Sequence, residues 1–308
     1  MPPIVEVKEL VKVYGSIQAL KGVTFTIPKG CITGFIGPNG AGKTTTMKIL
    51  IGQLKPDYGL VRVLGLDPWL QGHILCNRLG YLPENPTYPS NVSCSKLLEF
   101  IAKLKGITSI EREIRRIAYI TELKEYLERK VESLSRGYLQ RLALAIALIG
   151  QPELVILDEP TANLDPIARA NILKLIRKIH KDEGIDFIIS SHILPELENI
   201  CNYIIVINKG VILDYGDILT LTRRYMETVR LTLNVPKGVN ITGVYKDLMS
   251  LDYVKGVELE NKKRIKILLN VKSYNDFLEY MKKNKLIIIE ERVPNLLKLY
   301  SKIVGEEI

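Results

Sequence analysis

The sequence predicts an α/β protein whose main sheet is parallel. Two short apolar runs, Ile32–Ile36 and Leu154–Leu157, are typical of strands buried on both faces, which occur mainly in parallel sheets. The first run is followed by a glycine-rich loop and a segment of helical period, and the second ends in two carboxylates. From about residue 221 strands and helices alternate again, which predicts a separate small α+β domain.

The loop after the first run reads Gly37-Pro38-Asn39-Gly40-Ala41-Gly42-Lys43-Thr44-Thr45. Strand, glycine loop and helix in this order are what a phosphate-binding P-loop requires. Glycines let successive backbone N–H groups converge on a phosphate, and a helix that begins near Gly42 adds its N-terminal dipole. We expect Lys43 to contact the β- and γ-phosphates and Thr44 to ligate Mg²⁺. The alternative is a glycine-rich turn that fits the pattern by chance.

The second run ends in Asp158 and Glu159, where the strand leaves the core. In P-loop enzymes the first such carboxylate holds Mg²⁺, usually through its water, which predicts that role for Asp158. Glu159 is then placed to activate a water molecule as general base. Strands often end in acidic turns, so the P-loop upstream is what favours the catalytic interpretation.

Between these segments lies Leu134-Ser135-Arg136-Gly137-Tyr138-Leu139-Gln140-Arg141, which leads into an apolar helix over Leu142–Ile149. A hydroxyl and a glycine at a helix start form a further anion site, and Ser135 is also able to cap the helix. The alternative is an ordinary capped helix without a ligand.

This segment resembles the signature of ABC transporter nucleotide-binding subunits, Leu-Ser-Gly-Gly-Gln followed by a Gln-Arg pair and the Asp-Glu strand. Four residues match the pattern: Ser135, Gly137, Gln140 and Arg141. Arg136 and Tyr138 depart from it in a way that resembles the branch serving ABC-2-type exporters. The resemblance covers about residues 1 to 220 and implies that the signature binds the ATP of a partner subunit.

The resemblance implies roles for four further residues. Tyr14 resembles the aromatic residue that stacks on adenine, with a core tyrosine at a strand end as the alternative. His192, after the apolar strand at 187–189, resembles the switch histidine that contacts the γ-phosphate, with a structural histidine as the alternative. Asp165 resembles the D-loop residue that touches the partner. Glu84 stands where most members have a glutamine that senses Mg²⁺, so it adds a carboxylate beside the triphosphate.

The composition agrees with a cytoplasmic protein. The 308 residues are enough for two domains, and 46% hydrophobic with 25% charged residues is typical of soluble proteins. The longest charge-free apolar stretches, such as Leu142–Pro152, are shorter than the ~18–20 residues that span a bilayer, and no signal peptide pattern is present. Four cysteines without metal spacing indicate a reduced compartment: they are Cys31, Cys76, Cys94 and Cys201.

The net charge of +9 has two interpretations, a solvated surface or attraction to anionic lipid beside a membrane partner. No aromatic residues interleave with a basic patch, so nucleic acid is not an expected partner.

The expected domains are residues 1–220, an ATPase domain with a P-loop core of RecA-like type, and residues 221–308, an accessory domain. In the first, an antiparallel β-subdomain precedes a helical subdomain at about 84–148, where five apolar residues recur at helix spacing: Leu97, Leu98, Phe100, Ile101 and Leu104. In the second we expect a ferredoxin-like β-α-β-β-α-β order. Its strands are 229–235, 254–260, 264–271 and 285–292, and its helices are 241–250 and 273–283. A last helix from Asn295, after Pro294, resembles the closing helix of exporter ATPases.

The resemblance therefore implies an ATP-binding and ATP-hydrolysing subunit of an ABC-2-type exporter with ATP and Mg²⁺ as cofactors. Two such subunits, identical or different, sandwich two ATP molecules, and their closure drives separate integral-membrane permease subunits. This places the chain on the cytoplasmic face of the cell membrane. The alternative is a soluble ABC ATPase acting on ribosomes or nucleic acid. Members of that kind usually carry two nucleotide domains or long coiled-coil insertions, and this chain has neither.

Overall fold

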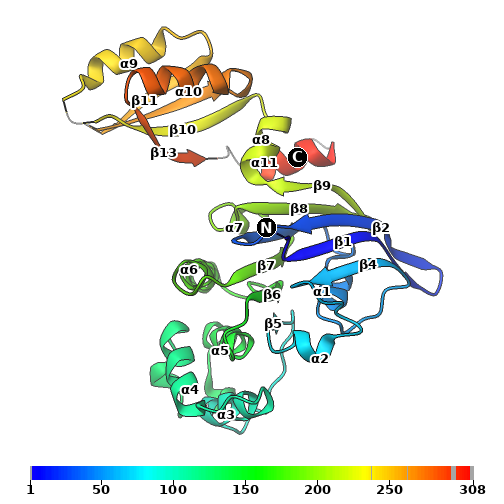
Figure 1. The fold of residues 1–308 in the computed structure, drawn as a ribbon. Helices are drawn as coiled ribbons and strands as arrows, with labels where there is room; N and C mark the ends of the chain where they lie inside the picture. The colour runs from blue at the N-terminus through cyan, green and yellow to red at the C-terminus, as the bar shows by residue number, and fades with distance from the viewer. Residues whose placement is uncertain (1, 237, 262, 293–295, 306–308) are drawn as a thin grey trace. The chain divides into compact units, whose positions relative to one another are not determined.

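The computed structural model describes residues 2–236, 238–261, 263–292 and 296–305. The chain divides into two compact units, Met1–Tyr215 and Gly216–Ile308, each with an apolar core of its own (Figure 1). The α/β fold class is confirmed, since a mainly parallel sheet lies at the centre of the first unit.

The central sheet has six strands in the order β5-β6-β7-β3-β8-β9. They are β5 (Leu79–Leu82), β6 (Leu154–Asp158), β7 (Asp186–Ser191), β3 (Ile32–Ile36), β8 (Tyr203–Asn208) and β9 (Val211–Asp217). The pairs β5–β6, β6–β7, β7–β3 and β3–β8 are parallel. Every residue of β3, β6 and β7 is buried, because helices or a second sheet cover both faces.

A smaller antiparallel sheet forms the predicted β-subdomain. Its order is β2-β1-β4, with β1 (Val5–Tyr14), β2 (Ile17–Ile27) and β4 (Tyr58–Val63). Helix α1 (Lys43–Leu50), which follows the glycine loop, is covered by both sheets, since Met47 and Leu50 are fully buried in the core that the two sheets share. The start of α1 is therefore fixed relative to both sheets.

The helical subdomain lies between β5 and β6, as predicted. It contains α3 (Cys94–Leu104), α4 (Ile110–Ile120) and α5 (Arg136–Leu148), and a four-residue helix α2 (Gly72–Leu75) precedes β5. The apolar spacing of α3 is only partly a buried face, since Leu98 is fully buried whereas Phe100 and Leu104 are 57% and 68% exposed. After β6 come α6 (Pro166–Glu183) and, beyond β7, the short α7 (Leu194–Leu197).

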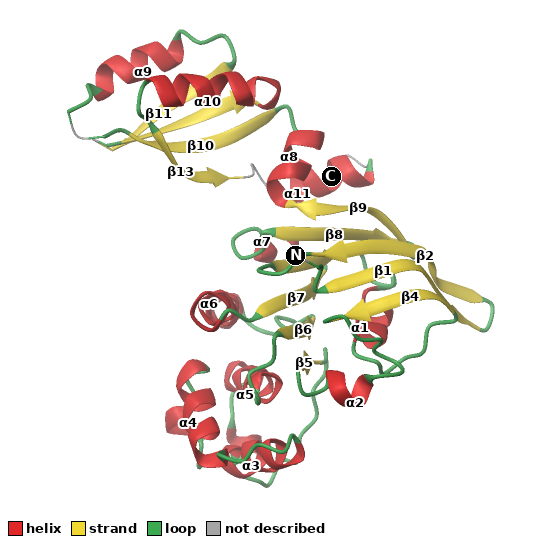
Figure 2. Cartoon of the chain, in the orientation of Figure 1, coloured by secondary structure: helices red, strands yellow, loops and turns green. Residues whose placement is uncertain are grey.

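The second unit is a four-stranded antiparallel sheet in the order β11-β12-β10-β13, with two helices on one face (Figure 2). Its elements are α8 (Ile218–Tyr225), β10 (Thr228–Asn234), α9 (Ile241–Met249), β11 (Val254–Asn261), β12 (Arg264–Asn270), α10 (Tyr274–Lys283), β13 (Ile287–Arg292) and α11 (Leu296–Val304). The strands and helices agree closely with those expected, but α8 was not predicted. The ferredoxin-like type stays a prediction, and Pro294 and Asn295 lie outside the described residues.

Among the residues that the structure describes, no helix combines the length and the apolar character needed to cross a membrane.

Candidate active site

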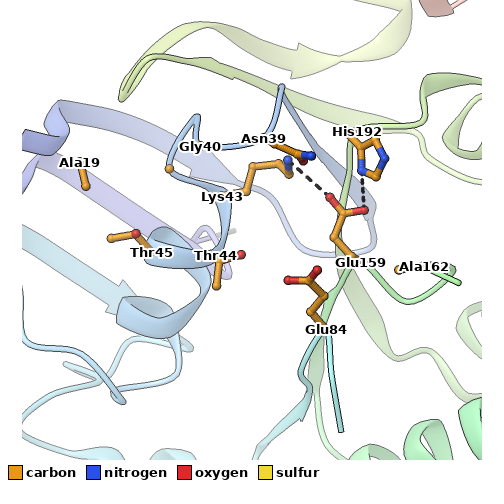
Figure 3. A pocket seen from close by; sticks show the side chains of 11 residues that line it. Ala19, Asn39, Gly40, Lys43, Thr44, Thr45, Glu84, Glu159, Ala162 and His192 are labelled. Carbon is orange, nitrogen blue, oxygen red and sulfur yellow. Dashed lines mark hydrogen bonds and ion pairs between the residues drawn. The ribbon is translucent and has the colours of Figure 1, made fainter.

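Four segments predicted from the sequence meet at one edge of the central sheet. The glycine loop follows β3, Asp158 ends β6 and Glu159 follows it, His192 follows β7 and Glu84 follows β5. Because these strands are parallel and neighbouring, their carboxyl ends lie at the same edge. The segments enclose a cavity of about 340 Å³ (Figure 3). It is lined by Ala19, Asn39, Gly40, Gly42, Lys43, Thr44, Thr45, Glu84, Glu159, Ala162 and His192.

Two glycines of the loop are required by geometry. Gly42 precedes α1 with a φ of 109°, a conformation that other residues rarely adopt. A Cβ on Gly37 would lie 2.2 Å from the carbonyl oxygen of Ile207 on β8. The loop is held from the same side by the N–H of Gly210, which donates to the Ala41 carbonyl at 3.0 Å. The backbone is therefore fixed close to the sheet edge.

Lys43 is buried at the loop, with 7% of its surface exposed. Its ammonium group donates to the carbonyl oxygens of Gly37 at 2.8 Å and Pro38 at 3.2 Å. The same Nζ lies 3.4 Å from Oε1 of Glu159. A positive charge is thus held at the wall of the cavity, facing the Glu159 carboxylate just after β6.

Glu159 connects the two sides of the cavity. Its Oε2 lies 3.0 Å from Nδ1 of His192, while Oε1 faces Lys43 (Figure 3). The side chain is 9% exposed, and the backbone φ of 49° is rare for a residue with a Cβ. Backbone outliers of this kind cluster at active sites, where the surrounding structure holds them in place.

Asp158 has one satisfied and one unsatisfied carboxylate oxygen. Oδ1 accepts a hydrogen bond from the Ser190 hydroxyl at 2.5 Å, and Oδ2 is buried without a hydrogen-bond partner in the described part of the chain. Burial, with the negative charges of Asp158 and Glu84, raises the pKa of Tyr81 to about 12. Excess negative charge and an unpaired carboxylate oxygen at one place suit a bound cation.

Tyr14 lies at the end of β1 and is 47% exposed, so the alternative of a core tyrosine is wrong. The ammonium of Lys12 lies 5.7 Å from its ring centroid. Tyr14 is not among the residues that line the cavity, whereas Ala19 of the adjacent strand β2 is.

A second cavity of about 350 Å³ contains the predicted signature and D-loop residues. Its lining includes Ser135, Arg136, Gly137, Tyr138 and Asp165, and it shares no lining residue with the first cavity. Ser135 stands at the N-cap of α5, but its hydroxyl makes no capping hydrogen bond, so the predicted side-chain cap is not observed. The helix also begins six residues before the apolar segment at Leu142 and includes most of the signature.

The two residues that depart from the signature pattern have partners of their own. The Arg136 guanidinium donates to the Asn163 carbonyl at 3.4 Å and so joins the signature to the D-loop. The Tyr138 ring stacks on Tyr126 with 3.7 Å between centroids. Asp165 caps α6, since its Oδ1 accepts from the N–H groups of Ile167 and Ala168 at 3.0 and 2.9 Å.

Sequence reasoning did not single out Ser190. Its hydroxyl contacts Asp158 and also accepts the N–H of Glu159 at 2.9 Å, so one side chain from β7 holds both carboxylate residues. The contact could be predicted only from the strand order, because Ser190 lies opposite Asp158 in the pairing of β6 with β7.

Comparisons with known proteins agree with this geometry. Residues 20–162 match the family model described as "ABC transporter". The chain is 34% identical over 230 residues to the bacitracin transport ATP-binding protein BcrA of Bacillus licheniformis, covering 74% of this chain and 75% of that protein. It is 36% identical over 225 residues to the protein of the same name from Enterococcus faecalis, covering 73% of this chain and 72% of that protein.

The solved structures to which this chain is similar are also parts of ABC transporters. The cbiO1 protein of Clostridium perfringens, described as part of the transporter complex cbiONQ, superposes with a TM-score of 0.64 at 28% identity. The match covers 70% of this chain and 89% of that one. A structure described as the ATP binding subunit of an ABC transporter has the same TM-score at 25% identity and covers 80% of this chain and all of its own.

Proposed function

The chain belongs to the ABC transporter family as an ATP-binding and ATP-hydrolysing subunit, and from this we propose that it powers an ABC-2-type exporter through separate membrane subunits. The similar bacitracin transport proteins support a function in transport rather than the alternative function on ribosomes or nucleic acid. The transported substrate of this chain depends on the membrane partner.

The observation that supports the proposal most directly is the separation of two half-sites. One cavity holds Lys43 and Glu159, and a different cavity holds Ser135 and Asp165. Each has polar groups suited to one side of a nucleotide. In a symmetric pair of subunits, the first cavity of one chain faces the second cavity of the other, so two chains complete two sites.

At its own nucleotide, the loop from Gly37 to Thr45 directs backbone N–H groups and the α1 N-terminus toward the phosphates. Lys43 exchanges its contacts with loop carbonyls for the β- and γ-phosphates, and Tyr14 stacks on the adenine. Glu159 accepts the proton of the attacking water, and His192 orients Glu159 and contacts the γ-phosphate. Positioning and electrostatic stabilisation then carry the reaction.

The residues present fit a magnesium ion. Asp158, next to Glu159 in the chain, offers the unpaired Oδ2, and Thr44 and Glu84 line the first cavity with further oxygen ligands. Described residues contain no group of three or more His, Cys, Asp or Glu side chains suited to a metal, so nucleotide oxygens and water must complete the ligand set. When bound, Mg²⁺ neutralises charge that develops on the phosphates.

At the partner's nucleotide, the signature residues Ser135 and Gly137 supply a hydroxyl and a helix N-terminus. Arg136 adds a cation beside them, and Asp165, which lines the same cavity, touches the partner subunit. We propose that subunit closure and reopening move integral-membrane permease subunits, with this chain on the cytoplasmic face. Residues 1–220 act as the ATPase domain, and residues 221–308 regulate hydrolysis or dimerisation.

The half-sites are tested in a Glu159→Gln background, where bound ATP persists. Adding Ser135→Trp fills the second cavity and leaves the first unchanged. We expect Mg-ATP affinity by calorimetry to stay within about threefold, while sedimentation shows loss of the ATP-dependent dimer. A Ser135→Trp chain that dimerises as well as its parent would show that the signature does not contact the partner's nucleotide.

The export role is tested by crosslinking in intact cells that make a tagged chain, followed by mass spectrometry. Recovery of one hydrophobic protein with several membrane spans supports the permease partnership. Recovery of ribosomal proteins instead would favour the alternative.

A further inference from the structure

A buried carboxylate near the active site has no role in the proposed chemistry. Glu196 lies on α7, four residues after His192, and its side chain is only 7% exposed. Its Oε2 accepts a hydrogen bond from the Thr161 hydroxyl at 2.5 Å. Its Oε1 lies 2.6 Å from Nη1 of Arg169 on α6. A buried carboxylate is costly unless paired in this way, so the contact fixes α7 to both neighbours.

The contacts of Glu196 complete a ring of chain segments and hydrogen bonds that includes Glu159 and His192. Thr161 is buried and follows Glu159 by two residues, and the chain between them turns tightly, with the Ala162 N–H donating to the Glu159 carbonyl at 3.0 Å. At the other end, His192 contacts Glu159 through the 3.0 Å hydrogen bond. Two noncovalent links, Thr161–Glu196 and His192–Glu159, therefore join two short backbone segments into a closed loop.

Arg169 extends this ring to the second cavity. Its Nη2 donates to the Leu164 carbonyl at 3.3 Å, and its N–H donates to the Asp165 carbonyl at 2.9 Å. Asp165 lines the cavity that contains the signature. One carboxylate thus links the segment that carries His192 with the segment that leads to the D-loop.

We propose that Glu196 is a positioning residue. It holds the His192 side chain in its orientation toward Glu159 and links the His192 segment to the D-loop at Asp165. The inference rests on the proposed function for the roles of His192 and Glu159. Glu196→Gln removes the ion pair with Arg169, whereas the burial of Leu194 and Leu197 on α7 is unchanged. The His192 imidazole then loses its fixed orientation toward Glu159.

The first test is spectroscopic and needs no activity. The chain has three histidines, so ¹⁵N-labelled imidazole signals are few, and His192→Ala identifies the one from His192. Glu196→Gln should shift or broaden the His192 signals in the full-length chain. Glu198→Gln, which changes an exposed carboxylate two residues away, is the matched control and should leave them in place. Unchanged His192 signals in a folded Glu196→Gln chain overturn the proposal.

The second test is kinetic. Glu196→Gln should lower kcat about tenfold or more and leave the KM for ATP within about threefold, because nucleotide binding at the glycine loop is untouched. Thr161→Val should act in the same direction, and Thr161→Ser should restore the rate because it keeps the hydroxyl. In a His192→Ala chain, Glu196→Gln should change the residual rate less than about twofold, since its effect passes through His192.

Failure of the proposed function and failure of the positioning role of Glu196 give different results. If wild type does not hydrolyse ATP, or Glu159→Gln hydrolyses it normally, the proposed function fails, and the histidine signals still test Glu196. If Glu159→Gln is inactive but Glu196→Gln has a normal kcat, or the effects of Glu196→Gln and His192→Ala are additive, the positioning role alone is lost. Melting temperatures of all variants identify any chain that does not fold.

Discussion

The hydroxyl of Ser190 lies 2.5 Å from Oδ1 of Asp158, and the two residues face each other across the paired strands β6 and β7. Ser190 is fully buried, and it also accepts the N–H of Glu159. The contact occupies Oδ1 of Asp158, whereas Oδ2, the proposed cation ligand, has no hydrogen-bond partner in the described part of the chain. The strand pair that forms the core therefore also orients the proposed metal ligand.

Ser190→Ala tests this relationship. The substitution leaves a buried carboxylate oxygen and a buried N–H without their partner, so the free energy of unfolding should fall by about 1–3 kcal/mol. It should also raise the Mg²⁺ concentration needed for half-maximal ATPase activity. Urea unfolding and a magnesium titration of the rate measure the two effects.

Thr33→Val is the matched control for Ser190→Ala. Thr33 is fully buried on the neighbouring strand β3, and its hydroxyl has no hydrogen-bond partner among the described residues. Replacing it breaks no hydrogen bond, so it should not lower the free energy of unfolding, and it should leave the magnesium dependence unchanged. Equal effects of the two substitutions would show that loss of any buried hydroxyl here has the same result, without a role for Asp158.

Glu159→Gln should abolish hydrolysis and keep ATP binding. The amide has nearly the same size but does not accept the proton of the water molecule. It also removes the negative charge 3.4 Å from Lys43, so affinity for Mg-ATP should be equal or tighter. The ATP-bound dimer should then accumulate and be visible by size-exclusion chromatography. Hydrolysis within about twofold of wild type would remove Glu159 from the role of general base.

Lys43→Ala should cost most of the ATP affinity. The lysine is the cation that the described structure places at the wall of the first cavity within the glycine loop, and its loss also removes the ammonium group 3.4 Å from the Glu159 carboxylate. The change should be about 1.5–3 kcal/mol, as for hydrogen bonds to charged groups. Calorimetry with Mg-ATP measures it, with Lys48→Ala on the same helix as control. Unchanged affinity in Lys43→Ala would contradict the phosphate-binding assignment.

Much of the site was predictable because it depends on local sequence and one topological rule. The glycine loop, Asp158 and His192 each follow an apolar run, and parallel neighbouring strands bring such ends together. Contacts between side chains on different elements were not predictable in this way. The Ser190–Asp158 hydrogen bond requires the order of β6 and β7, and the Arg136–Asn163 contact requires the packing of α5 beside α6.

In the second unit, strand and helix alternation predicted the elements well, and the exception is instructive. Helix α8 was not predicted, although Ile218 and Leu221 are buried at helix spacing. Its N-cap signal was present in the sequence, since Asp217 accepts the Thr220 N–H at 2.8 Å. At α5 a cap was expected from the sequence but is not formed, because Ser135 occupies the N-cap position and its hydroxyl makes no capping hydrogen bond.

The stability of the first unit should depend on pH through Glu113 of α4. Its carboxylate accepts hydrogen bonds from Arg116 and from the Gly150 N–H, and Arg116 also contacts Glu183 at 3.0 Å at the end of α6. Burial by itself raises the pKa of Glu113, but the bonds from Arg116 and Gly150 outweigh it and the net pKa is below the ordinary value. The unfolded chain therefore binds this proton more readily than the folded chain.

The lowered pKa of Glu113 in the folded chain predicts how the stability of Glu113→Gln changes with pH. The contribution of Glu113 is fully present above its unfolded pKa of about 4.3 and is lost as the pH falls through the lower folded value. The variant should therefore be less stable than wild type at neutral pH, and the difference should shrink below about pH 4. Urea unfolding across this range measures the difference, with the exposed Glu111→Gln as control. A difference that is constant with pH would exclude the linkage.

The final prediction concerns the second unit. Its core lies on the elements from β10 to β13, and the core of the first unit uses no residue beyond Tyr215, so the two cores have no residue in common. Truncation after Asp217 keeps β9 whole and removes every residue from α8 onward. The shortened chain should be soluble and bind ATP as the full chain does, because all proposed site residues precede the cut.

If residues 221–308 are regulatory, the truncation should change the ATPase rate or the ATP-dependent dimer population, measured with and without the membrane partner. A rate and a dimer population equal to those of the full chain in both conditions would show that the second unit is a passive appendage.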